Sequence, residues 1–295
     1  MNDLYGVDPA APSGEVELIS LLRLFGPTEG RFIYAFPDNW IGRVRVALEG
    51  LPQGQQNRAL AWLERQRRHL PSTNHRFLDN RSWAENALAL RAEVAGLIGP
   101  RSCPATLIPI DEILVNPDRL PDARGKHLPR TVTAYIQAVT PLLRASSKVV
   151  LVDPYFRLHA IDQAGRAVVA RQRKVLVAML AEALRLRKVS NFVLFTNRKE
   201  ALAVHNSEAA FAEELASTMA EVRGSAATSQ LELEYDFLDE RPDPKQHARY
   251  LLGNGCGIQF DHGFDTSNDA TRNHVHWMAP AELDPLLARF DVPGH

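Results

Sequence analysis

The residues best suited to chemistry in this chain lie in the short segment His247-Ala248-Arg249. Side chains two residues apart on a strand point to the same face, so His247 and Arg249 would converge on one spot. A guanidinium offers paired N–H donors to a phosphate, and an imidazole donates, accepts or attacks. The spacing therefore indicates a phosphate site. The alternative is an edge-strand pair that makes ordinary surface contacts.

Further polar residues follow the apolar segments KVVLVD and FVLFT, which predict buried parallel strands. Asp153 and Tyr155 come at the end of the first segment, and Thr196, Asn197 and Arg198 at the end of the second. Ligands of open α/β sheets bind beyond the carboxyl ends of such strands, so we expect these side chains to share the phosphate site. The alternative is that Asp153 and Asn197 cap turns and the helices that follow.

The segment HARYLLGNGCGIQFDHGFD, with VLVDPYF upstream, resembles the phospholipase-D-like domain found C-terminal to the MIT module in endosome-associated proteins. That domain carries a similar H-x-R, a glycine-containing turn and a closing G-[LF]-D, and the similarity covers Val149–Asp265. No MIT-like three-helix module is evident before it, so trafficking roles do not carry over. The matching positions are Asp153, Pro154, Tyr155, His247, Arg249, Tyr250, Gly263, Phe264 and Asp265.

The resemblance implies that the domain binds a phosphate-bearing ligand and does not cleave a phosphodiester bond. Phospholipase D enzymes use H-x-K-x4-D: one His attacks phosphorus, a His from a second repeat acts as acid, and Lys holds the oxyanion. Arg249 stands at the Lys position and Asn254 at the Asp position, so the carboxylate that would orient the His is missing. The chain offers one such half, so two active copies of His247 would require a homodimer.

Three functions remain open at this stage. We expect a non-catalytic protein that recognises nucleic acid or another phosphate-bearing ligand, as an accessory component of a bacterial antiphage or nucleic-acid-processing system. This context rests on analogy with stand-alone bacterial proteins that carry similar domains. The second function is a dimeric, metal-independent phosphodiesterase or nuclease that uses His247. The third is a structural adaptor with a vestigial site. None of them calls for a cofactor.

Two other groups of residues invite a ligand. His274 and His276 share a predicted strand face, which allows a metal pair. They lack the wider ligand spacing of a recognised site, so we interpret them as structural histidines and predict no metal. A basic stretch near the end of a predicted helix is the best candidate for a nucleic-acid contact in the first half, or else a solvated face. It comprises Arg65, Arg67, Arg68, His69, His75 and Arg76.

Composition narrows the protein class. The 295 residues carry a net charge of −1, which argues against coating nucleic acid by bulk attraction. No apolar run approaches the roughly 20 residues of a membrane-spanning helix. The polar, acidic first residues lack the layout of a signal peptide. Cys103 and Cys256 lie far apart and indicate free thiols. We therefore expect a cytoplasmic protein.

The pattern of elements predicts an α/β protein with a phospholipase-D-like domain over residues 126–295 and a mainly helical, partner-docking region over residues 1–125. The proline-punctuated stretch Gly99–Pro129 suggests the boundary. Strand–helix–strand–helix–strand followed by a meander predicts a mixed sheet with parallel core strands. The predicted strands of this sheet are Lys148–Asp153, Phe192–Thr196, Leu231–Phe237, Ala248–Leu252, Gly257–Phe260 and His274–Met278.

The first region is expected to hold one or two strands, with Arg31–Phe36 the clearest. A loose tail forms its first dozen residues, and helices cover Glu15–Leu24, Gln55–His69 and Ser82–Leu97. The last of these begins with Ser82-Trp83-Ala84-Glu85, a capping box before an apolar-periodic run. The predicted helices of the second domain are Thr131–Leu143, Arg166–Arg187, Ser207–Val222 and Pro280–Phe290.

Overall fold

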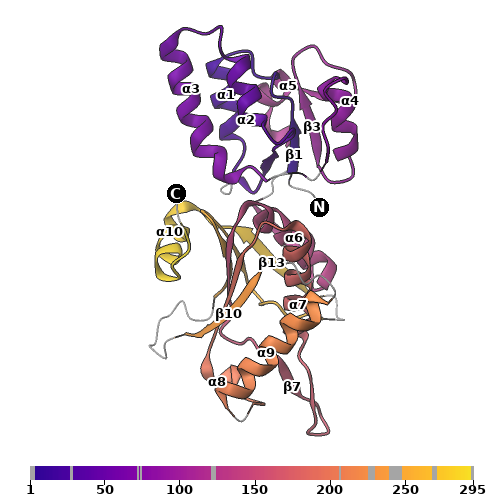
Figure 1. Cartoon of the computed structure of the whole chain (residues 1–295), viewed down its shortest axis with the longest axis vertical. Coiled ribbons are helices and arrows are strands. Elements are labelled where there is room, and N and C mark those ends of the chain that lie inside the picture. Colours follow the sequence, from indigo (N-terminus) through magenta and orange to yellow (C-terminus); the bar gives the residue numbers. More distant parts are fainter. Residues whose placement is uncertain are drawn as a thin grey trace. The chain divides into compact units, whose positions relative to one another are not determined.

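The chain forms two compact α/β units, one up to Arg124 and one from Gly125 to Gly294 (Figure 1). The sequence places this boundary one residue later. The computed structural model describes residues 4–26, 29–71, 73, 75–120, 124–205, 207–224, 230–238, 248–267 and 271–293.

A parallel four-stranded sheet forms the centre of the first unit. Its order is β2-β1-β3-β4, so the first strand of the chain lies between β2 and β3, where Tyr5 pairs with Ile33 and Gly96. The strands are β1 (Leu4–Val7), β2 (Phe32–Tyr34), β3 (Gly96–Gly99) and β4 (Ile108–Pro109).

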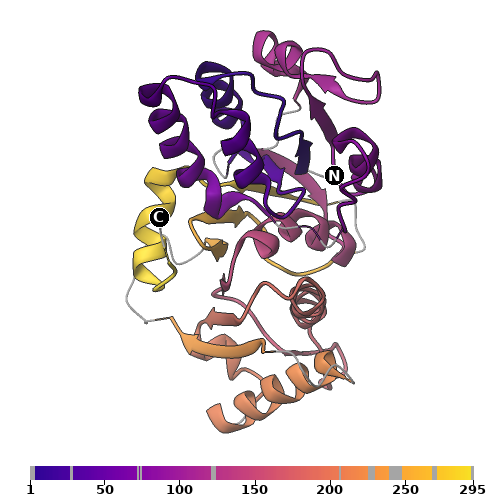
Figure 2. The ribbon, with the colours of Figure 1, turned by 45° about the horizontal axis from the view of Figure 1, so that its top comes forward.

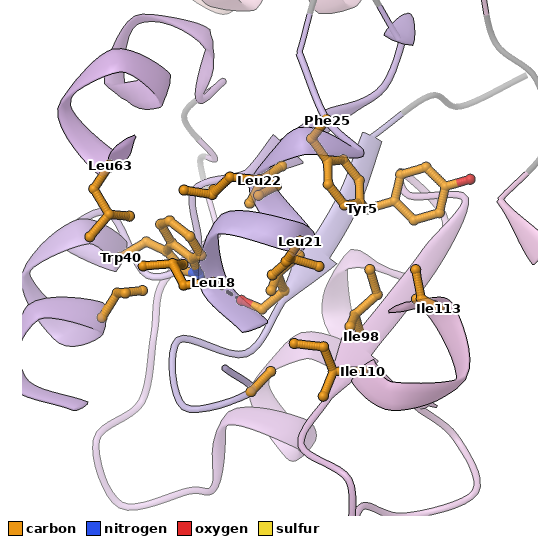
Figure 3. Close-up of a cluster of buried hydrophobic side chains, with 14 of the residues drawn as sticks. Tyr5, Leu18, Leu21, Leu22, Phe25, Trp40, Leu63, Ile98, Ile110 and Ile113 are labelled. Carbon is orange, nitrogen blue, oxygen red and sulfur yellow. Dashed lines mark hydrogen bonds between the residues drawn. The ribbon is translucent and has the colours of Figure 1, made fainter. Parts of the chain in front are cut away.

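Helices pack on this sheet through one apolar cluster (Figure 3). Leu18, Leu21 and Leu22 of α1 are fully buried in it. Trp40, at the start of α2, is also fully buried, and its indole N–H donates to the Val7 carbonyl at 2.7 Å. This bond ties a helix to the central strand. The helices are α1 (Glu15–Arg23), α2 (Trp40–Ala47), α3 (Gln53–Gln66), α4 (Trp83–Ala87) and α5 (Ile110–Val115).

Several predictions for the first unit are wrong. The supposed loose tail contains β1, and the unit has four strands in its described residues instead of one or two. The capping box at Ser82 and Glu85 is present, but α4 ends at Ala87 and the chain continues through a 3-10 turn into β3. Strands of two to four residues are too short to show periodicity, and a cap marks where a helix begins without fixing its length.

The second unit contains a seven-stranded mixed sheet, ordered β10-β9-β6-β11-β12-β13-β5. β6, β9 and β10 run parallel, and the other neighbours are antiparallel. The predicted class, a mixed sheet with parallel core strands, is confirmed. The strands are β5 (Gly125–Pro129), β6 (Lys148–Val152), β9 (Asn191–Thr196), β10 (Glu232–Phe237), β11 (Arg249–Gly253), β12 (Cys256–Phe260) and β13 (Arg272–Trp277).

Helices cover both faces of this sheet. Leu283 and Leu287 of α10 pack against Val152, Tyr250 and Leu252 on one face. In Figure 2 this helix is the yellow ribbon next to the strands of the second unit. Tyr135 of α6 stacks near Phe260 on the other face. A hairpin of β7 (His159–Ile161) and β8 (Ala167–Val169) precedes α7. The helices are α6 (Val132–Ala145), α7 (Arg171–Leu186), α8 (Arg198–Ala201), α9 (Glu208–Arg223) and α10 (Pro280–Arg289).

Helices of the described residues fall short of the length and apolarity that crossing a bilayer requires. Cys103 and Cys256 are free, as predicted.

Replacing Trp40 by Phe is expected to lower the free energy of unfolding by about 1–3 kcal/mol, because the buried Val7 carbonyl loses its donor. Urea unfolding of the full chain, followed by circular dichroism, measures this. Trp62→Phe is the control, since that half-buried ring lies under Arg23 and Arg65 and its replacement should cost less than about 1 kcal/mol. Equal losses in the two variants would contradict the assigned role of Trp40.

Candidate functional site

The register of the second sheet brings Asp153 and Arg249 together. Tyr250 pairs with Val152 across the antiparallel β11–β6 ladder, so Asp153, which follows Val152, lies opposite Arg249, which precedes Tyr250. Arg249 Nε is 3.7 Å from Asp153 Oδ1. The Asp153 side chain is 2% exposed and that of Arg249 is 21% exposed. A buried carboxylate and a half-buried guanidinium therefore face each other just beyond the carboxyl end of β6.

Two further contacts fix the guanidinium. It lies 5.0 Å from the centre of the Tyr155 ring, and its Nη1 donates to the Asp261 carbonyl at 2.9 Å. The backbone N–H of Tyr155 donates to Asp153 Oδ1 at 3.0 Å. Asp153, Tyr155 and Arg249, predicted from separate segments, thus form one cluster. The bond from the Tyr155 N–H to Asp153 Oδ1 is also the kind of local turn bond that the alternative interpretation, a turn cap, expects.

Gly263 lets the loop after β12 close over this cluster. Its φ is +78°, and a Cβ there would lie 2.8 Å from Arg249 Nε and 3.3 Å from Asp153 Oδ2. A side chain at this position would therefore displace the guanidinium. Phe264 anchors the loop, since it is buried and its ring centre lies 4.3 Å from that of Phe260.

A buried network of hydrogen bonds holds the same loop in place. Asn273 donates through Nδ2 to the Gly263 carbonyl at 2.8 Å and to the Tyr135 hydroxyl at 3.0 Å. That hydroxyl lies 3.2 Å from the Gly263 carbonyl and 3.1 Å from the Asp265 carbonyl. The Asp265 carboxylate pairs with Arg130 at 2.5 Å. No motif in the sequence marks Tyr135, Asn273 or Arg130, so these three residues were not predicted to support the site.

Burial dominates the electrostatics of Asp153. It raises the pKa of this carboxyl, while the Tyr155 N–H and the Arg249 charge act in the opposite direction and only partly offset it. Burial therefore favours the protonated, neutral form of Asp153, whereas Arg249 and the Tyr155 N–H favour the ionised form. A neutral Asp153 would leave the Arg249 charge uncompensated.

The three predicted residues at the end of β9 make other contacts. Thr196 is fully buried and donates to the Phe156 carbonyl at 3.2 Å. The Asn197 N–H donates to the Pro154 carbonyl at 3.3 Å, and its side chain forms no cap bond at the start of α8. Arg198 pairs with Glu208 at 2.7 Å and lies 4.3 Å from the centre of the Phe237 ring. These residues hold neighbouring backbone and α9, and their described contacts do not include Arg249.

His247 lies outside the described residues, as does the rest of 239–247. Asn254, which stands at the Asp position of the phospholipase D pattern, is among the described residues. Asn254 Oδ1 accepts from the N–H groups of Ser147 and Lys148 at 3.0 and 3.1 Å. Asn254 thus fixes the start of β6, at the opposite end of β11 from Arg249.

Three described residues of the basic stretch in the first unit have local surroundings of their own. Arg67 pairs with Glu64, and His75 Nε2 lies 2.8 Å from Glu93. His69 is buried. The two pairs are the kind of local contact that a solvated helix end makes, and the nucleic-acid contact stays a prediction.

Among the described residues, one group of side chains could hold a metal ion. It consists of Asp261, His274 and His276. By the pairing of β11, β12 and β13, Arg249 lies opposite Phe260, whereas His276 lies opposite Gln259. Because neighbouring residues of a strand point to opposite faces, the histidines and Arg249 are on different sides of the sheet.

Comparisons with known proteins leave the family open. No protein family matches the chain, and no curated protein matches it either. Among solved structures, that of TrmBL2, an archaeal chromatin protein reported to show a novel mode of DNA binding, aligns with 87% of this chain and 68% of its own. The sequence identity is 11% and the TM-score is 0.28, too low to bear on fold or function.

Gly263→Ala should destabilise the protein more than Gly165→Ala does. Both glycines have positive φ, at +78° and +76°, so each alanine adds backbone strain of about 1–2 kcal/mol. Gly165 has no atoms within 4 Å of a Cβ, whereas Gly263 faces Arg249. The steric contact should add about 1–3 kcal/mol, measured by urea unfolding. Equal losses would mean that the loop does not pack on Arg249 as described.

Stability should depend on pH through Asp153. Because its pKa is raised in the folded state, the folded chain holds this proton more tightly than the unfolded chain. The contribution is complete below the ordinary value of 3.8 and is lost as pH rises through the folded-state pKa. The unfolding free energy of the wild type minus that of Asp153→Asn should therefore fall over this range. A difference that rises with pH would show that Arg249 outweighs burial.

Proposed function

We propose that the second unit is a phospholipase-D-like domain that binds a phosphate-bearing ligand, nucleic acid first, and does not cleave it. The observation that carries this proposal is the fixed guanidinium of Arg249 at the carboxyl end of β6, between Asp153 and the Tyr155 ring. The H-x-R, the Gly263-Phe264-Asp265 loop that packs on it, and the Asp153-Pro154-Tyr155 turn are the segments that resemble that family.

A guanidinium held in this way is suited to a phosphate. Arg carries several N–H donors in a planar fork, and one of those of Arg249, on Nη1, is used by the Asp261 carbonyl. The side chain is 21% exposed, so an oxyanion can reach it from one side. Stacking on Tyr155 orders the fork before the ligand arrives, which lowers the entropic cost of binding.

Asp153 tunes this charge. An anion bound to Arg249 is a second negative group near Asp153, and like charges favour the protonated form of a carboxyl. Burial already raises the pKa of Asp153, so phosphate binding is expected to be accompanied by proton uptake at this residue. A protonated Asp153 no longer neutralises the guanidinium, so the positive charge of Arg249 acts on the ligand.

Two features argue for binding without cleavage. The superfamily reaction needs a nucleophilic His and a second His as acid, and this chain has one H-x-R and no H-x-K. The carboxylate that would orient the nucleophile is replaced by Asn254, whose side chain is bonded to the start of β6. A homodimer with two copies of His247 could supply the second imidazole, which makes a nuclease the alternative outcome of the test.

The first unit would dock a protein partner, and the whole chain would serve as an accessory component of a cytoplasmic antiphage or nucleic-acid-processing system in bacteria.

Binding is tested by fluorescence anisotropy of labelled single-stranded DNA, duplex DNA and RNA with the full chain. Arg249→Gln should weaken binding about 10- to 100-fold, as loss of a charge-assisted bond of about 1.5–3 kcal/mol requires. It should also reduce the slope of log affinity against log salt by about one. Arg185→Gln, an exposed change in an α7 intrahelical pair, is the control, and Arg198→Gln should behave like it.

The same substrates and a chromogenic phosphodiester decide about catalysis. No turnover is expected, with or without chelator. Cleavage that disappears in a folded His247→Ala variant would replace the binding proposal by the dimeric nuclease. Absence of binding to all three nucleic acids and to inorganic phosphate, or equal binding by Arg249→Gln, would leave the structural adaptor.

A further inference from the structure

Asp261, His274 and His276 gather on the sheet face opposite Arg249. Each of these three residues offers one ligand atom, and the three atoms lie within 4.8 Å of one another. Two strands build this group. His274 and His276 are two residues apart on β13 and so share a face, and Asp261 follows β12, where its N–H donates to the His274 carbonyl at 3.1 Å.

Distances within the group are close to those of a metal site. Ligand atoms bound at 2.0–2.1 Å to a tetrahedral zinc ion are about 3.4 Å apart. His274 Nδ1 and Asp261 Oδ2 are 3.4 Å apart, and their side chains are 38% and 44% exposed. The other separations are at most 4.8 Å and would have to shorten by no more than about 1.4 Å, a change that side-chain rotation can supply.

His276 provides a second, independent observation. Its Nδ1 is buried, and no hydrogen-bond partner for it occurs among the described residues. A buried imidazole nitrogen without a partner is energetically costly, and the great majority of such atoms are satisfied by protein, water or an ion. A metal ion bound through this nitrogen would remove the cost, because neutral imidazole is a common metal ligand.

We propose that Asp261, His274 and His276 bind a divalent first-row transition metal ion, Zn²⁺ in the first place. Imidazole suits such ions, whereas Mg²⁺ and Ca²⁺ prefer sites made of oxygen atoms only. Three protein ligands leave a fourth position of the tetrahedron for water. This inference goes beyond the phosphate site and does not depend on it, since the two groups lie on opposite faces of the sheet.

The neighbouring strand β5 supports the site from the side. His127 pairs with His274 across the β13–β5 ladder, and the two ring centres are 4.8 Å apart. Gly125 leaves room beside His274, because a Cβ there would lie 3.2 Å from Nε2. A metal at this place would link β12 to β13 near the sheet edge and stabilise the folded unit by mass action.

Isothermal titration of the chelator-treated full chain with Zn²⁺ tests the proposal, and the visible absorption of added Co²⁺ reports tetrahedral coordination. One ion per chain is expected. His276→Ala and Asp261→Asn should each weaken binding at least about 100-fold, since loss of even an outer partner costs 10- to 100-fold. Zn²⁺ should raise the unfolding temperature of the wild type but not of these variants. Circular dichroism checks that the variants fold, and Asp261→Asn changes an exposed side chain.

Two controls identify the site. His262→Ala removes an exposed histidine next to Asp261 that is outside the group, and it should bind Zn²⁺ like the wild type. Cys103→Ser removes the half-exposed thiol and should also bind normally; burial raises the pKa of Cys256 to about 12, which makes it a poor competitor. No Zn²⁺ or Co²⁺ binding by the wild type, unchanged binding by His276→Ala, or loss in Cys103→Ser alone would each overturn the proposal.

Discussion

A carboxyl buried beside a β-sheet needs a cation or a proton, and much of the second unit is arranged around this requirement at Asp153. Arg249 supplies the cation from the neighbouring antiparallel strand, and the loop of Gly263 closes over the pair. Tyr135 and Asn273 in turn fix that loop by buried hydrogen bonds. Removing one partner from such a pair leaves an uncompensated charge, so strand, loop and helix depend on one another.

This dependence gives the proposed phosphate site its rigidity. At this proposed site, Arg249 would meet a phosphate with its orientation already set by Tyr155, Asp261 and Asp153. The same contacts limit its strength, because an ionised Asp153 competes with any phosphate for the guanidinium charge. Burial works against that competition by favouring the neutral carboxyl. The balance between the two is a physical account of how one Arg can serve both the fold and a ligand.

The alternation of the sheet separates the two proposed sites. One face of β11 and β12 carries Arg249 and Phe260 toward α6, and the other carries Tyr250 and Gln259 toward α10 and the histidines of β13. A ligand on one face therefore does not displace a ligand on the other. The antiparallel strands connect them, since the Asp261 carbonyl accepts from Arg249 while its carboxylate faces His274.

Local pattern was sufficient for the larger elements. The apolar runs of β6 and β9 and the amphipathic periods of α6, α9 and α10 predicted the mixed sheet with parallel core strands, because burial of a whole strand or of one helix face leaves a repeating mark in the sequence. Of the short strands of the first unit, β2 was anticipated within Arg31–Phe36, whereas β1, β3 and β4 left no such mark. The pairing of Asp153, Tyr155 and Arg249 was anticipated through the rule that sites form at strand ends.

Side-chain direction was decided by the tertiary structure alone. The sequence places Thr196 and Arg198 at the same edge of the sheet as Asp153, because β6 and β9 are parallel neighbours. In the structure, however, Thr196 donates to the Phe156 carbonyl and Arg198 pairs with Glu208. Asp261 joins His274 and His276 only because β12 and β13 pair in one register, and Tyr135 reaches the loop from a distant helix. Local spacing was enough to identify the candidate residue types and the longer strands that carry them. Long-range pairing decided which of these residues meet, since contacts between distant segments are not encoded in local spacing.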